Sequence, residues 1–137
     1  MNKLKNLVSR FNSKSLPTPI APYSHASLVD HGDFSMLWTS GIIGVDKEQN
    51  LVSDKIENQT EQCLKVLSTI LEENNGSLKN IIKVNIYITN MDDFSKVNEV
   101  YSKYFIDDLP ARTCIEVSKL PKNAVVEIEA TAAIKNV

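Results

Sequence analysis

Apolar and polar residues alternate with a period of two in several short segments of the chain, as they do in half-buried β-strands. The first third of the sequence contains three such segments, at residues 8–11, 25–29 and 34–40. Residues 30–33, with the sequence DHGD, separate the last two segments, and glycine supplies the backbone freedom that a hairpin turn needs. The pattern therefore predicts a short first strand, a proline-rich connector at residues 16–24 and a β-hairpin.

Apolar residues in the segment 54–73 recur instead every three or four positions, which is typical of an amphipathic helix. These positions are Ile56, Cys63, Leu64, Leu67, Ile70 and Leu71. The sequence Asn74-Asn75-Gly76 follows them, and asparagine and glycine readily adopt the left-handed conformation that ends many helices. We therefore predict a helix that packs one face on a core and ends at this sequence.

The second half of the chain opens with another alternating segment, residues 82–88, whose isoleucine and valine residues favour a pleated strand. Asn90 can cap a second helix, because Asp92 and Asp93 follow it in the first turn. Pro110 lies beyond the end of this helix, where it cannot disturb the helical hydrogen bonds. The predicted apolar stripe comprises Phe94, Val97, Tyr101 and Tyr104.

Residues 112–117 and 125–134 alternate again and predict the last two strands. The element order is then βββαβαββ. We expect an α+β fold in which both helices cover one face of a mixed sheet. No repeat, low-complexity tract or linker divides the chain, which indicates a single domain over residues 1–137.

Composition excludes several classes of protein. With 137 residues, of which 42% are hydrophobic, the chain is long enough to bury a core without a disulfide or a metal ion. Its formal net charge of -2 disfavours a general nucleic-acid binder, which usually carries a basic face. No apolar run approaches the roughly 18 residues of a membrane-spanning helix, so we expect no membrane partner.

The first 29 residues are basic and rich in serine, and they contain no acidic residue before Asp30, as in many organelle transit peptides. Pro17, Pro19 and Pro22 would nevertheless interrupt a long amphipathic helix in this region. We therefore expect a cytoplasmic protein, and the alternative is a protein of the mitochondrion or of another organelle.

One arginine and two glutamates are candidates for chemistry. Arg112 begins the strand 112–117, and its planar guanidinium can bind a carboxylate through two parallel hydrogen bonds. A solvated arginine, or one paired with a surface acid, would give the same pattern. Glu127 and Glu129 share one face of the strand 125–134, where a partly buried carboxyl with a raised pKa could activate water. The alternative is a solvated face or a pair with a basic residue of a neighbouring strand.

Hydroxyl groups collect near the predicted strand ends, where binding sites commonly form. Tyr23, Ser24 and Ser40 supply these hydroxyls, and Gly41 allows a ligand to approach the backbone closely. They are weak indications when taken one at a time.

Cysteine and histidine residues give no sign of a metal site. Cys63 and Cys114 lie in separate segments without a second cysteine or a histidine at ligand spacing, so we expect two buried thiols. His25 and His31 also lack a spaced partner, and His31 is expected to be a turn residue. No phosphate-binding or dinucleotide-binding motif occurs.

The segments "IAPYS", "TSGIIGV", "KVNIYITNMDDFSKVNEVYSKYF" and "PARTCIEVSKLPKNAVVEIEA" occur in this order and closely resemble the RidA/YjgF family of reactive-intermediate deaminases. The resemblance covers residues 8–134 and leaves residues 1–7 as an N-terminal extension. It implies a chorismate-mutase-like α+β fold. It also implies a homotrimer in which the sheets form a central β-barrel and the sites lie between subunits.

The resemblance further implies the hydrolysis of enamines and imines, such as 2-aminoacrylate and 2-iminopropionate, to 2-oxo acids and ammonia. Members of the family need no metal or organic cofactor. By its place in the motif, Arg112 is expected to bind the substrate carboxylate with help from the backbone of Cys114, and Glu127 to orient the attacking water. Further positions that match the family site are Tyr23, Ser40, Gly41 and Asn98.

Some residues depart from the family pattern. Ala21 replaces a common glycine, and Ile42 and Gly44 stand where glutamine and proline are frequent, which suggests that the loop accepts a different substrate side chain. The segment 105–110 is shorter than in many relatives and has Leu109 where an aromatic residue is common. Two alternatives remain open: an RNA-binding, endoribonuclease or translation-inhibitor member of the same family, and a non-catalytic sensor of 2-oxo acids.

Overall fold

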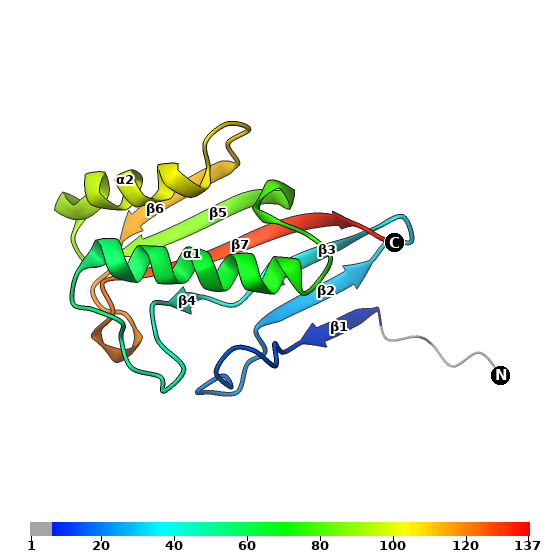
Figure 1. Cartoon of the computed structure of the whole chain (residues 1–137), viewed down its shortest axis with the longest axis horizontal. Coiled ribbons are helices and arrows are strands. Elements are labelled where there is room, and N and C mark those ends of the chain that lie inside the picture. Colours follow the sequence, from blue (N-terminus) through cyan, green and yellow to red (C-terminus); the bar gives the residue numbers. More distant parts are fainter. Residues whose placement is uncertain (1–6) are drawn as a thin grey trace.

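The polypeptide forms a twisted seven-stranded sheet, and two helices lie on the same face of it (Figure 1). This computed structural model describes residues 7–137, so the extension predicted for residues 1–7 lies almost wholly outside the described residues. The strands are β1 (Val8–Phe11), β2 (Ala26–Asp30), β3 (Phe34–Thr39), β4 (Ile42–Ile43), β5 (Ile81–Ile88), β6 (Ala111–Glu116) and β7 (Val126–Lys135). The helices are α1 (Ile56–Glu72) and α2 (Phe94–Tyr104), with short 3-10 helices η1 (Leu78–Asn80), η2 (Met91–Asp93) and η3 (Pro121–Asn123).

The strand order is β1-β2-β3-β7-β5-β6, and β4 pairs with β7 beside this path. β5 and β6 run parallel and the other pairs run antiparallel, which confirms the predicted mixed sheet. The predicted order βββαβαββ was wrong in one respect, because it lacked β4. A strand of two residues has no periodicity that a sequence pattern could detect.

Helix α1 ends as predicted, with Asn75 in the left-handed region at a φ of 66° and the Gly76 amide donating to the Leu71 carbonyl oxygen at 2.8 Å. The predicted cap of the second helix needs a correction. The Asn90 side chain accepts a hydrogen bond from the Asp92 amide at 3.0 Å, so it caps η2 and not α2 itself. The chain therefore makes one tight turn before α2 begins.

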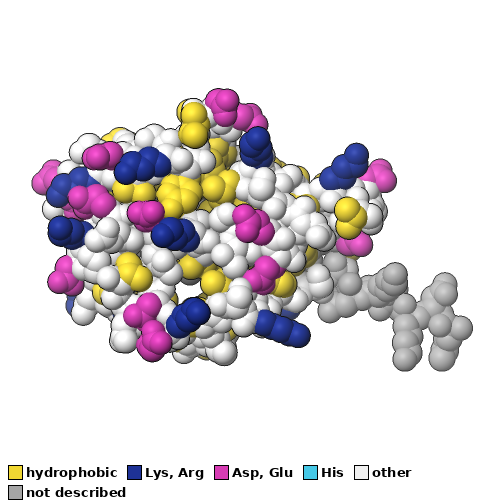
Figure 2. Space-filling model, in the orientation of Figure 1, with side chains coloured by type: hydrophobic (Ala, Val, Ile, Leu, Met, Phe, Trp, Pro, Cys, Tyr) yellow, Lys and Arg dark blue, Asp and Glu magenta, His cyan; other side chains and the backbone are white. Residues whose placement is uncertain are grey.

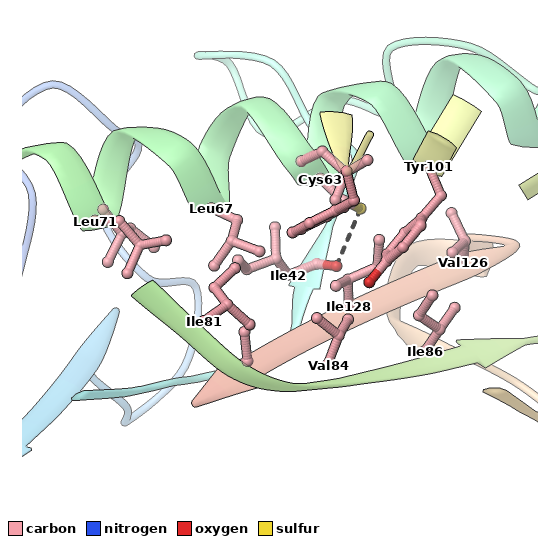
Figure 3. Packing of buried hydrophobic residues seen from close by; sticks show 14 of the residues in the cluster. Ile42, Cys63, Leu67, Leu71, Ile81, Val84, Ile86, Tyr101, Val126 and Ile128 are labelled. Atoms are coloured by element: carbon pink, nitrogen blue, oxygen red, sulfur yellow. Dashed lines mark hydrogen bonds between the residues drawn. The ribbon is translucent and has the colours of Figure 1, made fainter. Parts of the chain in front are cut away.

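The hydrophobic core lies between the helices and one face of the sheet (Figure 3). Leu67 and Leu71 point from α1 toward Ile81 and Val84 of β5, and the Cys63 thiol donates a hydrogen bond to the Ile42 carbonyl oxygen at 3.2 Å. All of these side chains are buried. The core confirms the stripe predicted for α1.

The stripe predicted for α2 is only partly correct. Val97 and Tyr101 are buried, but Phe94 remains 39% exposed and Val100, which the pattern did not single out, is buried. The prediction of two buried thiols is also half right, since Cys63 is fully buried and Cys114 only partly. Both deviations occur next to Arg112, which occupies the space between α2 and β6.

No helix covers the opposite face of the sheet within the described part of the chain, and we call it the open face. Side chains that alternate with the core residues point from it, including Phe34 and Trp38 of β3 and Ile115 of β6, each at least 40% exposed. On the helix-bearing face, positive and negative side chains are interspersed and form no patch of one sign (Figure 2). Among residues 7–137, no helix has the length and apolar character needed to cross a membrane.

Candidate active site

Glu127 lies on the open face, opposite Tyr87 of β5 and Ile43 of β4 in the strand register. Its side chain is half-buried, because the turn between β3 and β4 passes directly over it. A Cβ atom at Gly41 would stand 2.6 Å from the Glu127 Cδ atom, a distance that real structures do not tolerate. Glycine at position 41 thus permits the carboxyl group to approach the backbone.

The surroundings of Glu127 favour its protonated form. Partial burial raises the pKa of the Glu127 carboxyl, and the negative charge of Glu129 raises it further. Glu129 in turn accepts a short hydrogen bond from the Tyr87 hydroxyl, which together with burial raises the pKa of Tyr87 to about 12. A carboxyl group whose pKa is raised in this way is a suitable general base near neutral pH.

A cavity of about 600 Å³ opens beside Glu127. Tyr23, Ser40 and Gly41 line this cavity together with the glutamate, so the structure brings four of the predicted site residues together. The Ser40 hydroxyl donates to the Ser24 carbonyl oxygen at 2.6 Å, and this bond holds the end of β3 against the proline-rich connector. The volume suits a small organic ligand.

Arg112 lies on the helix-bearing face, between β6 and α2. Its Nη2 atom donates a hydrogen bond to the Asn98 Oδ1 atom at 2.7 Å. The guanidinium carbon stands 4.7 Å from the centroid of the Tyr101 ring and 5.5 Å from that of Phe94, within the range of cation–π attraction. An amide and two aromatic rings therefore hold the arginine in place.

Among residues 7–137, the Arg112 charge has no acidic partner. No carboxylate of these residues lies within 4.0 Å of its guanidinium, and the two ion pairs that they form involve lysine. The remaining N–H donors are therefore available to an anionic ligand. Burial raises the pKa of the nearby Cys114 thiol while Arg112 partly lowers it, so the thiol stays protonated near neutral pH and is a poor nucleophile.

The residues around Arg112 and the residues around Glu127 do not meet within one chain. Arg112 pairs in register with Val84 of β5, whereas Glu127 pairs with Tyr87. Residues 84 and 87 are an odd number of positions apart, so their side chains, and those of their partners, point to opposite faces of the sheet. Strand β5 also separates β6 from β7. Asn98 and Cys114 belong to the arginine group, and the cavity residues belong to the glutamate group.

Sequence reasoning assigned no functional role to Phe94 and Tyr101, which it placed in the apolar stripe of α2. Both rings contact the guanidinium of Arg112, although Tyr101 is also part of the core. Their spacing of seven residues puts them on one helix face. Two aromatic residues at this spacing are expected both in a packed core and in a cation site, so the sequence pattern could not distinguish the two roles. Within residues 7–137, no three His, Cys, Asp or Glu side chains gather so that they could hold a metal ion.

The family model described as Endoribonuclease L-PSP matches residues 13–134. The chain belongs to this family, which is also the RidA/YjgF family. A RutC family protein of Pyrococcus horikoshii is 44% identical over 121 residues, which are 88% of this chain and 93% of that protein. The predicted family resemblance is therefore confirmed.

Solved structures of RidA/YjgF proteins have the same fold. The Rid family protein YyfA of Yersinia pestis is 39% identical, with a TM-score of 0.84 over 93% of this chain and 99% of that one. TdcF of E. coli, solved with bound serine, is 31% identical, with a TM-score of 0.81 over the same shares of the two chains. The names of family relatives range from endoribonuclease to regulator.

Proposed function

We propose that the protein hydrolyses 2-imino acids, and the enamines in equilibrium with them, to 2-oxo acids and ammonia. The observation that carries this proposal is the Arg112 guanidinium, which is fixed by Asn98 and by the aromatic rings of α2 and has no acidic partner in the described part of the chain. Such a group is suited to bind a carboxylate through two charge-assisted hydrogen bonds. The cavity beside Glu127 supplies the second requirement, a base next to a space for the reacting carbon and a water molecule.

The reaction needs little beyond orientation and one proton carrier. Arg112 holds the substrate carboxylate while Glu127 accepts a proton from water. The water oxygen bonds to the imine carbon, the electrons of the C=N bond pass to nitrogen, and nitrogen takes the proton that Glu127 has just accepted. Glu127 then carries the hydroxyl proton of the tetrahedral intermediate to nitrogen as the C–N bond breaks, so ammonia leaves and the 2-oxo acid forms. Acid–base assistance of this kind typically contributes ~10²–10⁴-fold.

The two halves of this site require a second copy of the chain. Because Arg112 and Glu127 point from opposite faces of one sheet, we propose that each site combines the arginine of one subunit with the glutamate of the next. Interfaces that join two different surfaces form a ring when the rotation between neighbouring subunits closes. The exposed Trp38 and Ile115 side chains on the open face are suited to be buried in this assembly. The family resemblance favours three subunits.

Hydrolysis is tested by coupling the protein to a pyridoxal-phosphate dehydratase that releases the imine from serine or threonine. We expect the protein to accelerate the decay of the imine well beyond its spontaneous reaction with water. The measurement is the yield of imine trapped by semicarbazide, with and without the protein. A trapped yield that the protein leaves unchanged would contradict the proposal.

Mixed oligomers test the shared site. Arg112→Ala and Glu127→Gln variants are each expected to be inactive, but co-expressed at equal levels with different tags they should recover about a quarter of wild-type activity, because about one interface in four pairs two intact halves. Light scattering should give three times the monomer mass of 15.3 kDa. A stable monomer, or no recovery in verified mixed oligomers, would refute the shared site.

A ribonuclease is the second candidate, since the family model carries that description. The interspersed charges of the helix-bearing face and the net charge of -2 do not favour a polyanionic substrate. RNA cleavage that persists in the Arg112→Ala variant, together with no hydrolysis of imines by the wild type, would favour this candidate. Binding of 2-oxo acids without any turnover would indicate a ligand sensor.

A further inference from the structure

The cavity beside Glu127 continues past Ser40 and Gly41 into a space between α1 and the connector 16–24. Val66 and Ile70 are four residues apart on α1, so they present one stripe of the helix to this space. We call this part of the cavity the side-chain chamber. Its apolar walls are formed by Leu16, Ile20, Ile43, Val45, Val66 and Ile70.

Hydrogen bonds hold the connector over the chamber. The Ser13 hydroxyl donates to Glu73 Oε1 at 2.8 Å, and the Ser15 hydroxyl donates to the same oxygen just beyond the end of α1. Farther along, the Gln49 side-chain amide donates to the Thr18 carbonyl oxygen at 2.7 Å. Together with the bond from the Ser40 hydroxyl to the Ser24 carbonyl oxygen, these contacts hold the connector just before its start, at Thr18 and at its end, and none of them involves a ligand.

This inference rests on the proposed function: we propose that the side-chain chamber receives the side chain of the 2-imino acid. The protein then prefers imines with large apolar side chains, such as those formed from leucine, over 2-iminopropionate. The methyl group of 2-iminopropionate leaves most of the chamber empty, whereas a larger branched side chain buries apolar surface against Val66 and Ile70. Each buried methylene favours binding by about fourfold.

The preference is measured with imines that an L-amino acid oxidase forms from leucine and from alanine. We expect kcat/KM for the leucine-derived imine to exceed that for 2-iminopropionate by about tenfold or more, since three additional carbon atoms enter the chamber. The readout is competition between the protein and semicarbazide for each imine. Equal values, or a preference for the smaller imine, would overturn the inference.

Two variants localise the preference to the chamber. Val66→Phe fills the chamber and Ile20→Ala enlarges it, so both should lower the ratio of kcat/KM for the larger imine over the smaller one. Ile20 is 49% exposed, so its truncation should not prevent folding. The Ile20 variant therefore keeps the test valid even if the Val66 variant does not fold. Ile106→Ala is the matched control, because Ile106 is 80% exposed and lies outside the cavity. Its ratio should equal that of the wild type.

Binding of the 2-oxo acid products separates this inference from the proposed function. Calorimetry should show tighter binding of 4-methyl-2-oxopentanoate than of pyruvate, and Ile20→Ala should reduce the difference. Hydrolysis of both imines without this difference overturns the chamber alone. Tighter binding of the larger 2-oxo acid without hydrolysis of either imine supports the chamber and overturns the enzymatic function.

Discussion

Replacement of Arg112 by alanine will lower kcat/KM for imine hydrolysis by about 10²–10⁴-fold, because two hydrogen bonds to a charged group are lost, each worth about 1.5–3 kcal/mol. The guanidinium lies half-buried over the Tyr101 ring and has no acidic partner within the described chain, so the donors that Asn98 does not use are available to an external anion. The loss is measured by the semicarbazide competition assay, with binding of a 2-oxo acid as a second readout.

Arg10 offers a matched control for this variant. It is the only other arginine of the chain and lies exposed in β1, which the four strands β2, β3, β7 and β5 separate from β6. Arg10→Ala removes the same charge from the protein and should retain wild-type kcat/KM. An Arg112→Ala variant with wild-type kcat/KM, or equal losses in the two variants, would contradict the role of Arg112.

Replacement of Glu127 by glutamine will reduce kcat by about 10²–10⁴-fold, the range typical of a lost general base, while binding of 2-oxo acids changes little. The amide keeps the size of the carboxyl group against Gly41 but cannot accept a proton from water. In the wild type, activity should fall as pH decreases through the raised pKa of Glu127, above the ordinary value of 4.5. An equal loss of binding and of kcat would instead indicate a structural role.

The same variant should gain stability at neutral pH. Because the pKa of Glu127 is raised in the folded protein, the unfolded chain loses this proton first as pH rises. The free energy of unfolding therefore decreases between pH 4.5, the ordinary pKa, and the raised pKa. Glutamine does not ionise, so it avoids this decrease and raises the free energy of unfolding at neutral pH by less than about 1 kcal/mol, because the group is only half-buried. Glu129→Gln is the control: it should keep most of the activity and move the acid limb of the pH profile to lower pH, because a negative neighbour is lost.

Most of the fold could be predicted from the sequence because the apolar positions of β5, β7 and α1 have a single clear period. The strand β4 could not, since two residues have no period. The separation of Arg112 from Glu127 was equally hidden. Their strands follow one another in the chain, but β5 lies between them in the sheet, and only the register shows that the side chains point to opposite faces.

The side-chain chamber was beyond sequence reasoning for a different reason. Its walls come from the connector, from β4 and the loop after it, and from α1, and each apolar residue taken alone is consistent with an ordinary core position. Ala21, Ile42 and Gly44 gave the hints, because they depart from the family pattern in the connector and in the segment that leads to Val45. A cavity forms where side chains leave the space between elements unfilled, whereas a sequence pattern indicates only which residues pack.

The proposed sharing of each site between two subunits predicts that the activity depends on the concentration of the protein itself. If each site needs two chains, mass action governs catalysis, and dilution below the dissociation constant of the oligomer lowers the activity per molecule. A cell that makes little of the protein then gains disproportionately little activity from it. In the proposed assembly, the position of one strand, β5 between β6 and β7, thereby links the amount of protein to the rate per chain.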